Sequence, residues 1–273
     1  MKITAKEVND LRKVTGAGMM DCKKALVESE GNFDKAIENL RKKGQKVAAN
    51  RADRSSSEGV VLAKVNSNNT EGILISLNCE TDFVAKNDSF IKLANDIAEI
   101  ALNHDSIKNI LNSKIQGINI SDKLIEQTGV IGEKIEIGSF QKIKGEYVGS
   151  YIHAGNKLAS LVSLSKKTPD SPEISKNISM QVAAMNPIAL DKESVDKNII
   201  DKETQIIKEQ LIQEGKPEKI IENIANGKLN KFFKDNTLIN QNYIKESKIS
   251  VKDYINSIDK ELEIRNFSRL SLS

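Results

Sequence analysis

The spacing of apolar and polar residues over positions 4–44 predicts three short helices. Thr4 and Glu7 form a capping box, in which each side chain satisfies a free backbone amide at the start of the first helix. Gly16-Ala17-Gly18 separates the first helix from the second. Gly31 ends the second helix, Asn32 caps the third, and Gly44 follows the third. We expect the third helix to end at Gly44, a basic helix over 46–54, and a serine-rich linker over 55–59.

Two β-hairpins are predicted downstream, each followed by a loop and an amphipathic helix. Their strands are Gly59–Val65 with Glu71–Asn78, and Glu146–Ala154 with Lys157–Leu164. The following helices begin near Asn87 and near Pro172, after loops at 81–86 and 165–171. The repeated order indicates a structural duplication. Residues 103–120 are polar and predict only a flexible connection or a short helix.

Residues 196–233 predict two amphipathic helices that turn at Gly215-Lys216-Pro217, an antiparallel helical hairpin. Such an arm can mediate dimerisation, or it can pack on its own core. Ser250 is expected to cap a further short helix. Residues Leu262–Phe267 predict a last strand.

These elements predict an α+β fold with a duplicated core of antiparallel hairpins and flanking helices. The expected units are a helical domain, a first core half with a connector, a second core half, the helical arm, and a return to the core. Their expected ranges are 1–54, 55–140, 141–195, 196–233 and 234–273.

The composition argues against most enzyme classes. The 273 residues include two His, two Cys, no Trp, four Tyr and seven Phe, which is poor equipment for a metal site or an aromatic base-stacking platform. Cys22 and Cys79 are expected to be buried as small apolar side chains. No apolar stretch is long enough to span a membrane and the start lacks a signal sequence, so we expect a cytoplasmic protein without cofactor or metal.

The charge is uneven, with 13 basic and 8 acidic side chains in residues 1–54 but 28 and 30 in the remainder. This basic segment suits an acidic partner surface, or it is an ordinary solvated helix face. No segment has the basic character needed to follow a phosphate backbone, so no direct nucleic-acid binding is predicted.

Two positions attract attention as candidate chemistry. His153 lies at the turn of the second hairpin without an identifiable Ser or Cys partner, so a surface contact or a structural role is expected over hydrolysis. Asp82 and Phe83 follow the second strand, and neighbours in an extended chain point to opposite sides. Either Phe83 fills the core and Asp82 caps the next helix, or Phe83 is an exposed aromatic wedge beside a carboxylate.

Two long motifs resemble those of the bacterial elongation factor Ts family. They are Leu11-Arg12-x-x-Thr15-Gly16-Ala17-Gly18-Met19-Met20-Asp21-Cys22-Lys23-Lys24-Ala25-Leu26 and Asn78-Cys79-Glu80-Thr81-Asp82-Phe83-Val84-Ala85. Weaker matches follow in order at Gly149–His153, Gln181–Pro187, Gly215–Pro217 and Lys228–Phe232. The resemblance covers nearly the whole chain.

The resemblance implies a guanine nucleotide exchange factor for elongation factor Tu, with an N-terminal module similar to ubiquitin-associated domains and a dimerisation arm at 196–233. It implies that Thr81, Asp82, Phe83 and Val84 enter the GTPase near its magnesium site. Further implied contacts are Arg12, Met19, Met20 and His153, with one of the two methionines alternatively in the core. The other function considered is a ribosome- or peptide-binding adaptor without exchange activity.

Overall fold

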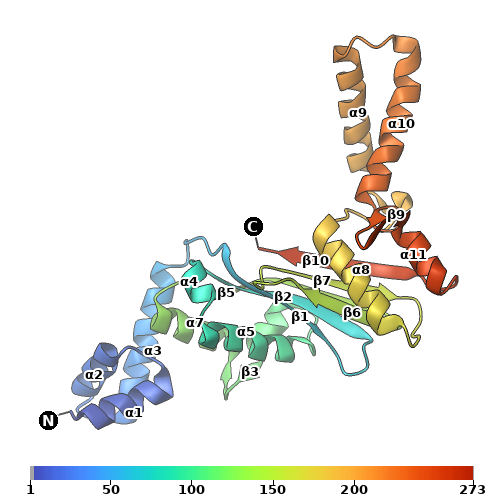
Figure 1. Ribbon diagram of the computed structural model, residues 1–273. Coiled ribbons are helices and arrows are strands. Elements are labelled where there is room, and N and C mark those ends of the chain that lie inside the picture. Colours follow the sequence, from blue (N-terminus) through green and yellow to red (C-terminus); the bar gives the residue numbers. More distant parts are fainter. Residues whose placement is uncertain (1–2, 273) are drawn as a thin grey trace.

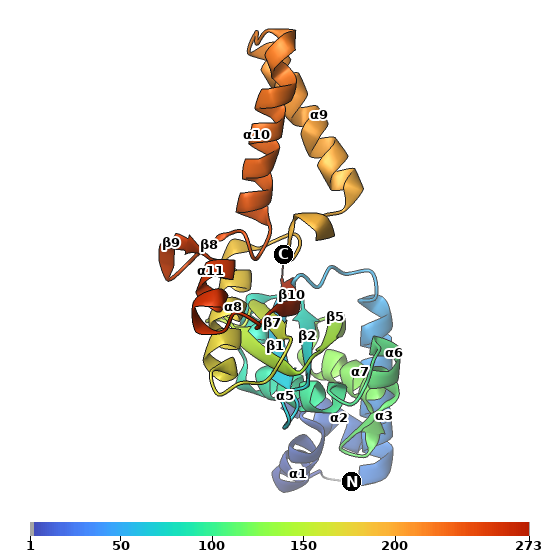
Figure 2. The same cartoon turned by 90° about the vertical axis from the view of Figure 1, so that its right-hand side faces the viewer.

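The computed structural model describes residues 3–272, with a helical module and a helical arm at opposite ends of a β-sheet body (Figures 1 and 2). The module consists of α1 (Ala5–Thr15), α2 (Met19–Glu28) and α3 (Phe33–Asn50). Thr4 and Asn32 cap α1 and α3 as predicted, and the Thr4 capping box is complete. Its core contains Leu11, Cys22 and Leu26, all fully buried.

The prediction that the third helix ends at Gly44 is wrong, because α3 continues without interruption to Asn50. Gly44 lies where α3 crosses α7 (Ile120–Ile131), and a Cβ added to it would lie 3.4 Å from the carbonyl oxygen of Ile125. The glycine therefore serves a close helix crossing rather than a helix end. The basic segment after Gly44 is the last part of the same helix up to Asn50, and the chain then turns into the linker.

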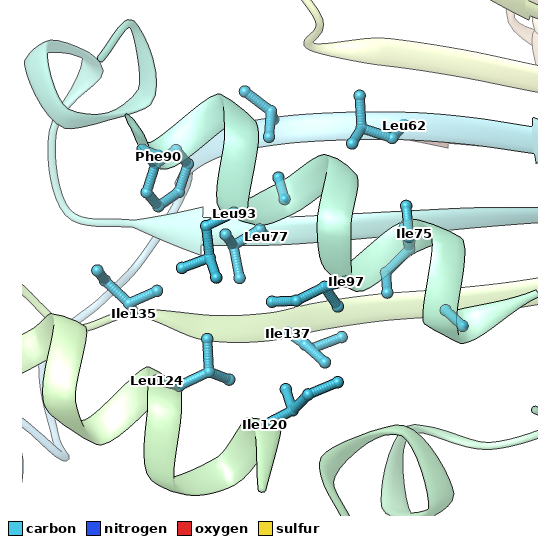
Figure 3. Close-up of a cluster of buried hydrophobic side chains, with 14 of the residues drawn as sticks. Leu62, Ile75, Leu77, Phe90, Leu93, Ile97, Ile120, Leu124, Ile135 and Ile137 are labelled. Carbon is cyan, nitrogen blue, oxygen red and sulfur yellow. The ribbon is translucent and has the colours of Figure 1, made fainter. Parts of the chain in front are cut away.

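The first half of the body is a three-stranded antiparallel sheet in the order β1-β2-β5. Strands β1 (Glu58–Val65) and β2 (Glu71–Cys79) form the predicted hairpin, with Glu58 opposite Cys79. Helix α5 (Asp88–Ala101) crosses one face of the sheet, and Figure 3 shows its Phe90, Leu93 and Ile97 directed at the strand side chains.

The strand β5 (Glu136–Lys144) was not predicted. It pairs with β2 along nearly its whole length and crosses the boundary expected between residues 140 and 141. The first sheet therefore extends to Lys144.

Residues 103–120 form short regular elements, including a short helix, rather than a flexible connection. It contains α6 (Ile107–Asn112) and a small hairpin of β3 (Lys114–Ile115) and β4 (Ile118–Asn119), and it leads into α7. Four apolar side chains from this region and α7 join the core under α5: Ile110, Ile115, Ile120 and Leu124.

The second half has the sheet order β10-β7-β6, formed by β6 (Tyr147–Ile152), β7 (Leu158–Leu164) and β10 (Ile264–Ser271). Helix α8 (Ser171–Met185) packs against this sheet, so the predicted repetition of hairpin and helix is confirmed. The last strand was predicted at Leu262–Phe267; it begins two residues later and continues to Ser271.

The two sheets pack against each other, which places a second core between them. Val61 and Leu74 of the first sheet meet Val148 and Leu161 of the second, and all four are fully buried. Neighbouring residues such as Val60 and Val61 therefore belong to opposite cores. This two-sided burial explains why the strands are almost continuously apolar.

The arm consists of α9 (Lys197–Gln213) and α10 (Glu218–Asn236), which form the predicted helical hairpin. The two helices pack on each other through a small cluster around Ile207, Leu211 and Ala225. Both views show the arm projecting from the body (Figures 1 and 2).

Shorter elements surround the base of the arm: η1 (Lys192–Ser194), β8 (Asn242–Tyr243), β9 (Glu246–Ser250) and α11 (Val251–Ile258). Ser250 caps α11 with a complete capping box, as predicted. Within residues 3–272, none of the helices combines the length and apolarity needed to cross a membrane.

Candidate protein-interaction site

The segment after β2 forms α4 (Asp82–Ala85), a single helical turn, where the sequence predicted a loop. Cys79 ends β2 fully buried, and Ala85 closes the turn against the core. Asn87, not Asp82, caps α5, because its side-chain oxygen accepts a hydrogen bond from the Ser89 amide.

Phe83 is 84% exposed, the largest exposed fraction among the large apolar side chains of the described residues. The alternative in which Phe83 fills the core is therefore wrong. In a helical turn, neighbouring side chains differ in direction by about 100° rather than pointing to opposite sides as in a strand. Val84 lies partly buried against the core under α5, which leaves Phe83 directed to solvent.

Asp82 is held ionised beside Phe83. Its Oδ2 lies 2.6 Å from Lys86 Nζ, one helical turn away, and this hydrogen-bonded ion pair lowers the pKa of Asp82. The charge of Lys157 lowers the pKa of Asp82 further. Phe83 is thus an aromatic side chain beside a carboxylate that remains charged at neutral pH.

Thr81 differs from its neighbours, because its hydroxyl is already used inside the protein. Thr81 Oγ1 donates a 2.7 Å hydrogen bond to Glu133 Oε1, so the side chain anchors the turn. Glu133 was not predicted to belong to this site, because it lies more than fifty residues further along the chain. Gly132, in the left-handed conformation (φ 83°) at the end of α7, was the local signal that the chain turns there.

The turn between β6 and β7 lies at the same end of the body as α4. Lys157 Nζ lies 2.7 Å from Glu58 Oε2, and the Asn156 carbonyl accepts a hydrogen bond from the Val61 amide at 2.6 Å. Glu58 pairs with Cys79, the last residue of β2, which leads into this site. The fold therefore brings the turn that contains His153 toward the turn that contains Asp82 and Phe83.

His153 is exposed, and its Nδ1 lies 3.0 Å from the Tyr151 hydroxyl. Its hydrogen-bond partner is thus Tyr151 of β6, the strand that leads into this turn, and not a serine or cysteine nucleophile. This arrangement suits a surface contact better than hydrolysis.

The structure also contains a Ser–His pair that was not predicted from the sequence. His104 Nε2 lies 2.7 Å from Ser113 Oγ, while Ser113 Oγ donates to the Asn109 carbonyl at 3.0 Å. Ser113 is the C-cap residue of α6, so the pair closes the end of this helix.

Arg12, Met19 and Met20 are exposed on the N-terminal module. Met19 and Met20 begin α2 and are 55% and 76% exposed, so neither belongs to the core. They form a second surface on a different unit from α4.

Cys22 and Cys79 are buried as predicted. Burial raises the pKa of the Cys79 thiol to about 12, which makes the thiol unreactive at neutral pH. Among the residues that the structure describes, no group of three or more His, Cys, Asp or Glu side chains could hold a metal ion.

The family model described as Elongation factor TS matches residues 80–273. The chain belongs to the elongation factor Ts family. It is 63% identical over 271 residues to the elongation factor Ts of Christiangramia forsetii, with 99% of each chain covered. It is 60% identical over 270 residues to that of Flavobacterium psychrophilum, covering 99% of this chain and 98% of the relative. The elongation factor Ts of Amoebophilus asiaticus is 48% identical over 273 residues, with 99% of both covered.

Membership in the elongation factor Ts family assigns the chain to translation elongation. The family match begins at Glu80 and includes Thr81–Val84 and His153. Arg12, Met19 and Met20 precede it, and only the full-length relatives cover them.

Proposed function

We propose that this chain is a guanine nucleotide exchange factor for elongation factor Tu. It binds the GDP-bound GTPase, disturbs the magnesium and phosphate site, and promotes GDP release so that GTP can bind. The observation that carries the proposal is the exposed Phe83 beside the ionised Asp82, on a turn whose sequence matches the family motif.

The chemistry of a bound nucleotide explains why such a turn is sufficient. Mg²⁺ bridges the nucleotide phosphates to the GTPase and neutralises their charge. An aromatic side chain that enters between elements of the GTPase shifts those elements, and an adjacent carboxylate offers a new acceptor or counter-charge. Both changes raise the free energy of the bound nucleotide without any covalent step on this chain.

Exchange by this route obeys thermodynamic reciprocity. If the factor weakens GDP binding, GDP weakens binding of the factor by the same ratio. Each tenfold change in affinity corresponds to about 1.4 kcal/mol, so a large effect needs several contacts. Arg12, Met19, Met20 and His153 are the exposed residues that we propose as these additional contacts.

The deciding experiment measures the release of a fluorescent GDP analogue from elongation factor Tu at fixed magnesium, with and without this protein. Strong acceleration is expected. Binding without acceleration would favour the adaptor function, in which the basic module contacts the ribosome or a peptide. Absence of both, with folded protein and a cognate GTPase, would contradict the proposed function.

A further inference from the structure

Glu80 and Glu133 connect the segment before Phe83 to the segment after α7, because each glutamate accepts backbone amides of the other segment. Glu133 Oε2 accepts hydrogen bonds from the backbone amides of Thr81 (3.0 Å) and Glu80 (3.2 Å). Its Oε1 accepts the Thr81 hydroxyl at 2.7 Å. In return, Glu80 Oε1 accepts the backbone amide of Lys134 at 2.7 Å. Each segment thus supplies a carboxylate to the amides of the other.

A third element is attached to this arrangement. Arg51, at the end of α3, donates from Nη1 to both carboxylate oxygens of Glu80, at 2.9 and 2.8 Å. The Glu80 side chain is only 16% exposed. The Lys134 amide, with Arg51 beside it, lowers the pKa of Glu80, so the carboxylate stays charged at neutral pH.

The turn that presents Phe83 needs such support. Helix α4 has only four residues, and the exposed Phe83 side chain contributes little packing of its own. No side-chain hydrogen bond caps α4, and the hydroxyl of its N-cap residue Thr81 donates to Glu133. The backbone of residues 80–81 enters α4 directly, so fixing these amides fixes the direction in which Phe83 leaves the body.

We propose that Glu133 is a positioning residue for exchange, which acts by holding the Glu80–Thr81 backbone so that Phe83 is presented in one orientation. The inference rests on the proposed function of the turn. It assigns a role to a half-buried side chain whose two carboxylate oxygens accept hydrogen bonds within the chain. Glu80 and Arg51 extend the same support to the N-terminal module, since α3 carries that module.

The first test needs no GTPase. Hydrogen exchange of the Thr81 amide is measured in the full chain and in the variants Glu133→Ala and Glu133→Gln. Glutamine keeps one oxygen to accept the two amides, so protection is expected to persist in Glu133→Gln and to fall at least tenfold in Glu133→Ala, a change typical of one lost hydrogen bond. Equal protection in all three proteins would overturn the proposal.

The second test measures GDP release at saturating factor. Glu133→Ala is expected to lower the maximal rate about tenfold, equivalent to about 1.4 kcal/mol, with Glu133→Gln within about twofold of the parent. Phe83→Ala should add little to Glu133→Ala if the two act through one orientation. Losses that simply multiply in the double variant would overturn the proposal.

Two controls keep the outcomes separate. Glu261→Ala removes an exposed carboxylate that lies 3.2 Å from Lys166, in the second half of the body, and should change neither readout. If Glu133→Ala does not fold, Thr81→Val removes the 2.7 Å bond alone and should still loosen the Thr81 amide. A parent protein that fails to accelerate GDP release would contradict the proposed function, while hydrogen exchange would still decide the role of Glu133.

Discussion

Gly44 of α3 and Gly129 of α7 face each other where the two helices cross. A Cβ built on Gly129 would overlap the Cα of Gly44, so the two backbones are in direct contact at the crossing. The crossing attaches the N-terminal module to the first half of the body. Its geometry decides how the exposed methionines of α2 are oriented relative to Phe83.

Gly129→Ala is therefore expected to destabilise the protein, by about 1–3 kcal/mol as for other overpacked sites. The matched control is Gly227→Ala in α10, where an added Cβ meets nothing within 4 Å. That substitution should leave stability unchanged or raise it by up to about 1 kcal/mol, because alanine favours helix. Thermal unfolding of both variants checks the pair, and an unaltered midpoint for Gly129→Ala would show that the helices separate easily.

Phe83→Ala is expected to slow GDP release from elongation factor Tu at least tenfold, the scale of an interface residue that carries much of the binding energy. Its thermal midpoint should stay close to that of the parent, because a side chain that is 84% exposed leaves no cavity when removed. Stopped-flow release of a fluorescent GDP analogue and thermal unfolding measure the two quantities.

Phe90→Ala provides the comparison, seven residues further along the chain. Phe90 is 1% exposed in the core under α5, so its removal should cost about 3–5 kcal/mol of stability. A comparable loss of stability in Phe83→Ala would contradict the view of Phe83 as a surface contact.

Glu80→Gln is expected to weaken the acid dependence of stability. The pKa of Glu80 is lowered in the folded state by the Lys134 amide and by Arg51. Its contribution is therefore present above the unfolded-state pKa, about 4.3 for glutamate, and lost as pH falls through the lower folded-state pKa. Urea unfolding of the parent and the variant should differ at pH 7 and converge in acid. The control Glu146→Gln, at an exposed side chain, should leave the unfolding free energy at pH 7 unchanged.

The arm supplies a prediction about self-association. Ile199 and Ile206 are 42% and 37% exposed and lie one heptad apart on α9. If the arm dimerises, Ile199→Ser with Ile206→Ser should convert the dimer to monomer in sedimentation experiments and preserve the cluster around Ile207 and Leu211. A parent protein that is monomeric throughout would contradict dimerisation by the arm.

Most of the helices and hairpins followed from local sequence rules, because their signals are local. The caps at Thr4, Asn32 and Ser250 are formed as predicted, and the hairpin turns lie where the polar residues indicated. The helix end predicted at Gly44 was wrong because this glycine serves a tertiary contact. In the sequence, a glycine that allows two helices to cross closely cannot be distinguished from a glycine that ends a helix.

The strand β5 was not predicted because its sequence also reflects a tertiary contact. Its register shifts opposite Ser76 and Leu77, and Gly138 packs on the Asn78 side chain, with an added Cβ only 2.5 Å from Asn78 Oδ1. The bulge interrupts the alternation of apolar residues, and glycine, serine and lysine lower the strand propensity.

The candidate site was predictable in its residues but not in its geometry. The motif at Asn78–Ala85 pointed to Phe83, while the strand rule could not decide its exposure because the segment folds as a helical turn. Glu133 could not be found at all, since only the fold brings it to Thr81.

At the base of the arm, the segment that enters it and the segment that leaves it are hydrogen-bonded to each other. The Ile188 amide donates to the Asn236 carbonyl at 2.9 Å, and the Leu238 amide donates to the Ala189 carbonyl at the same distance. The chain thus leaves and re-enters the body at neighbouring points, and the hairpin lies between α8 and β8 along the chain. Because its two ends are hydrogen-bonded to each other, deletion of matched whole turns from α9 and α10 is expected to leave the register of the sheet beneath it unaltered.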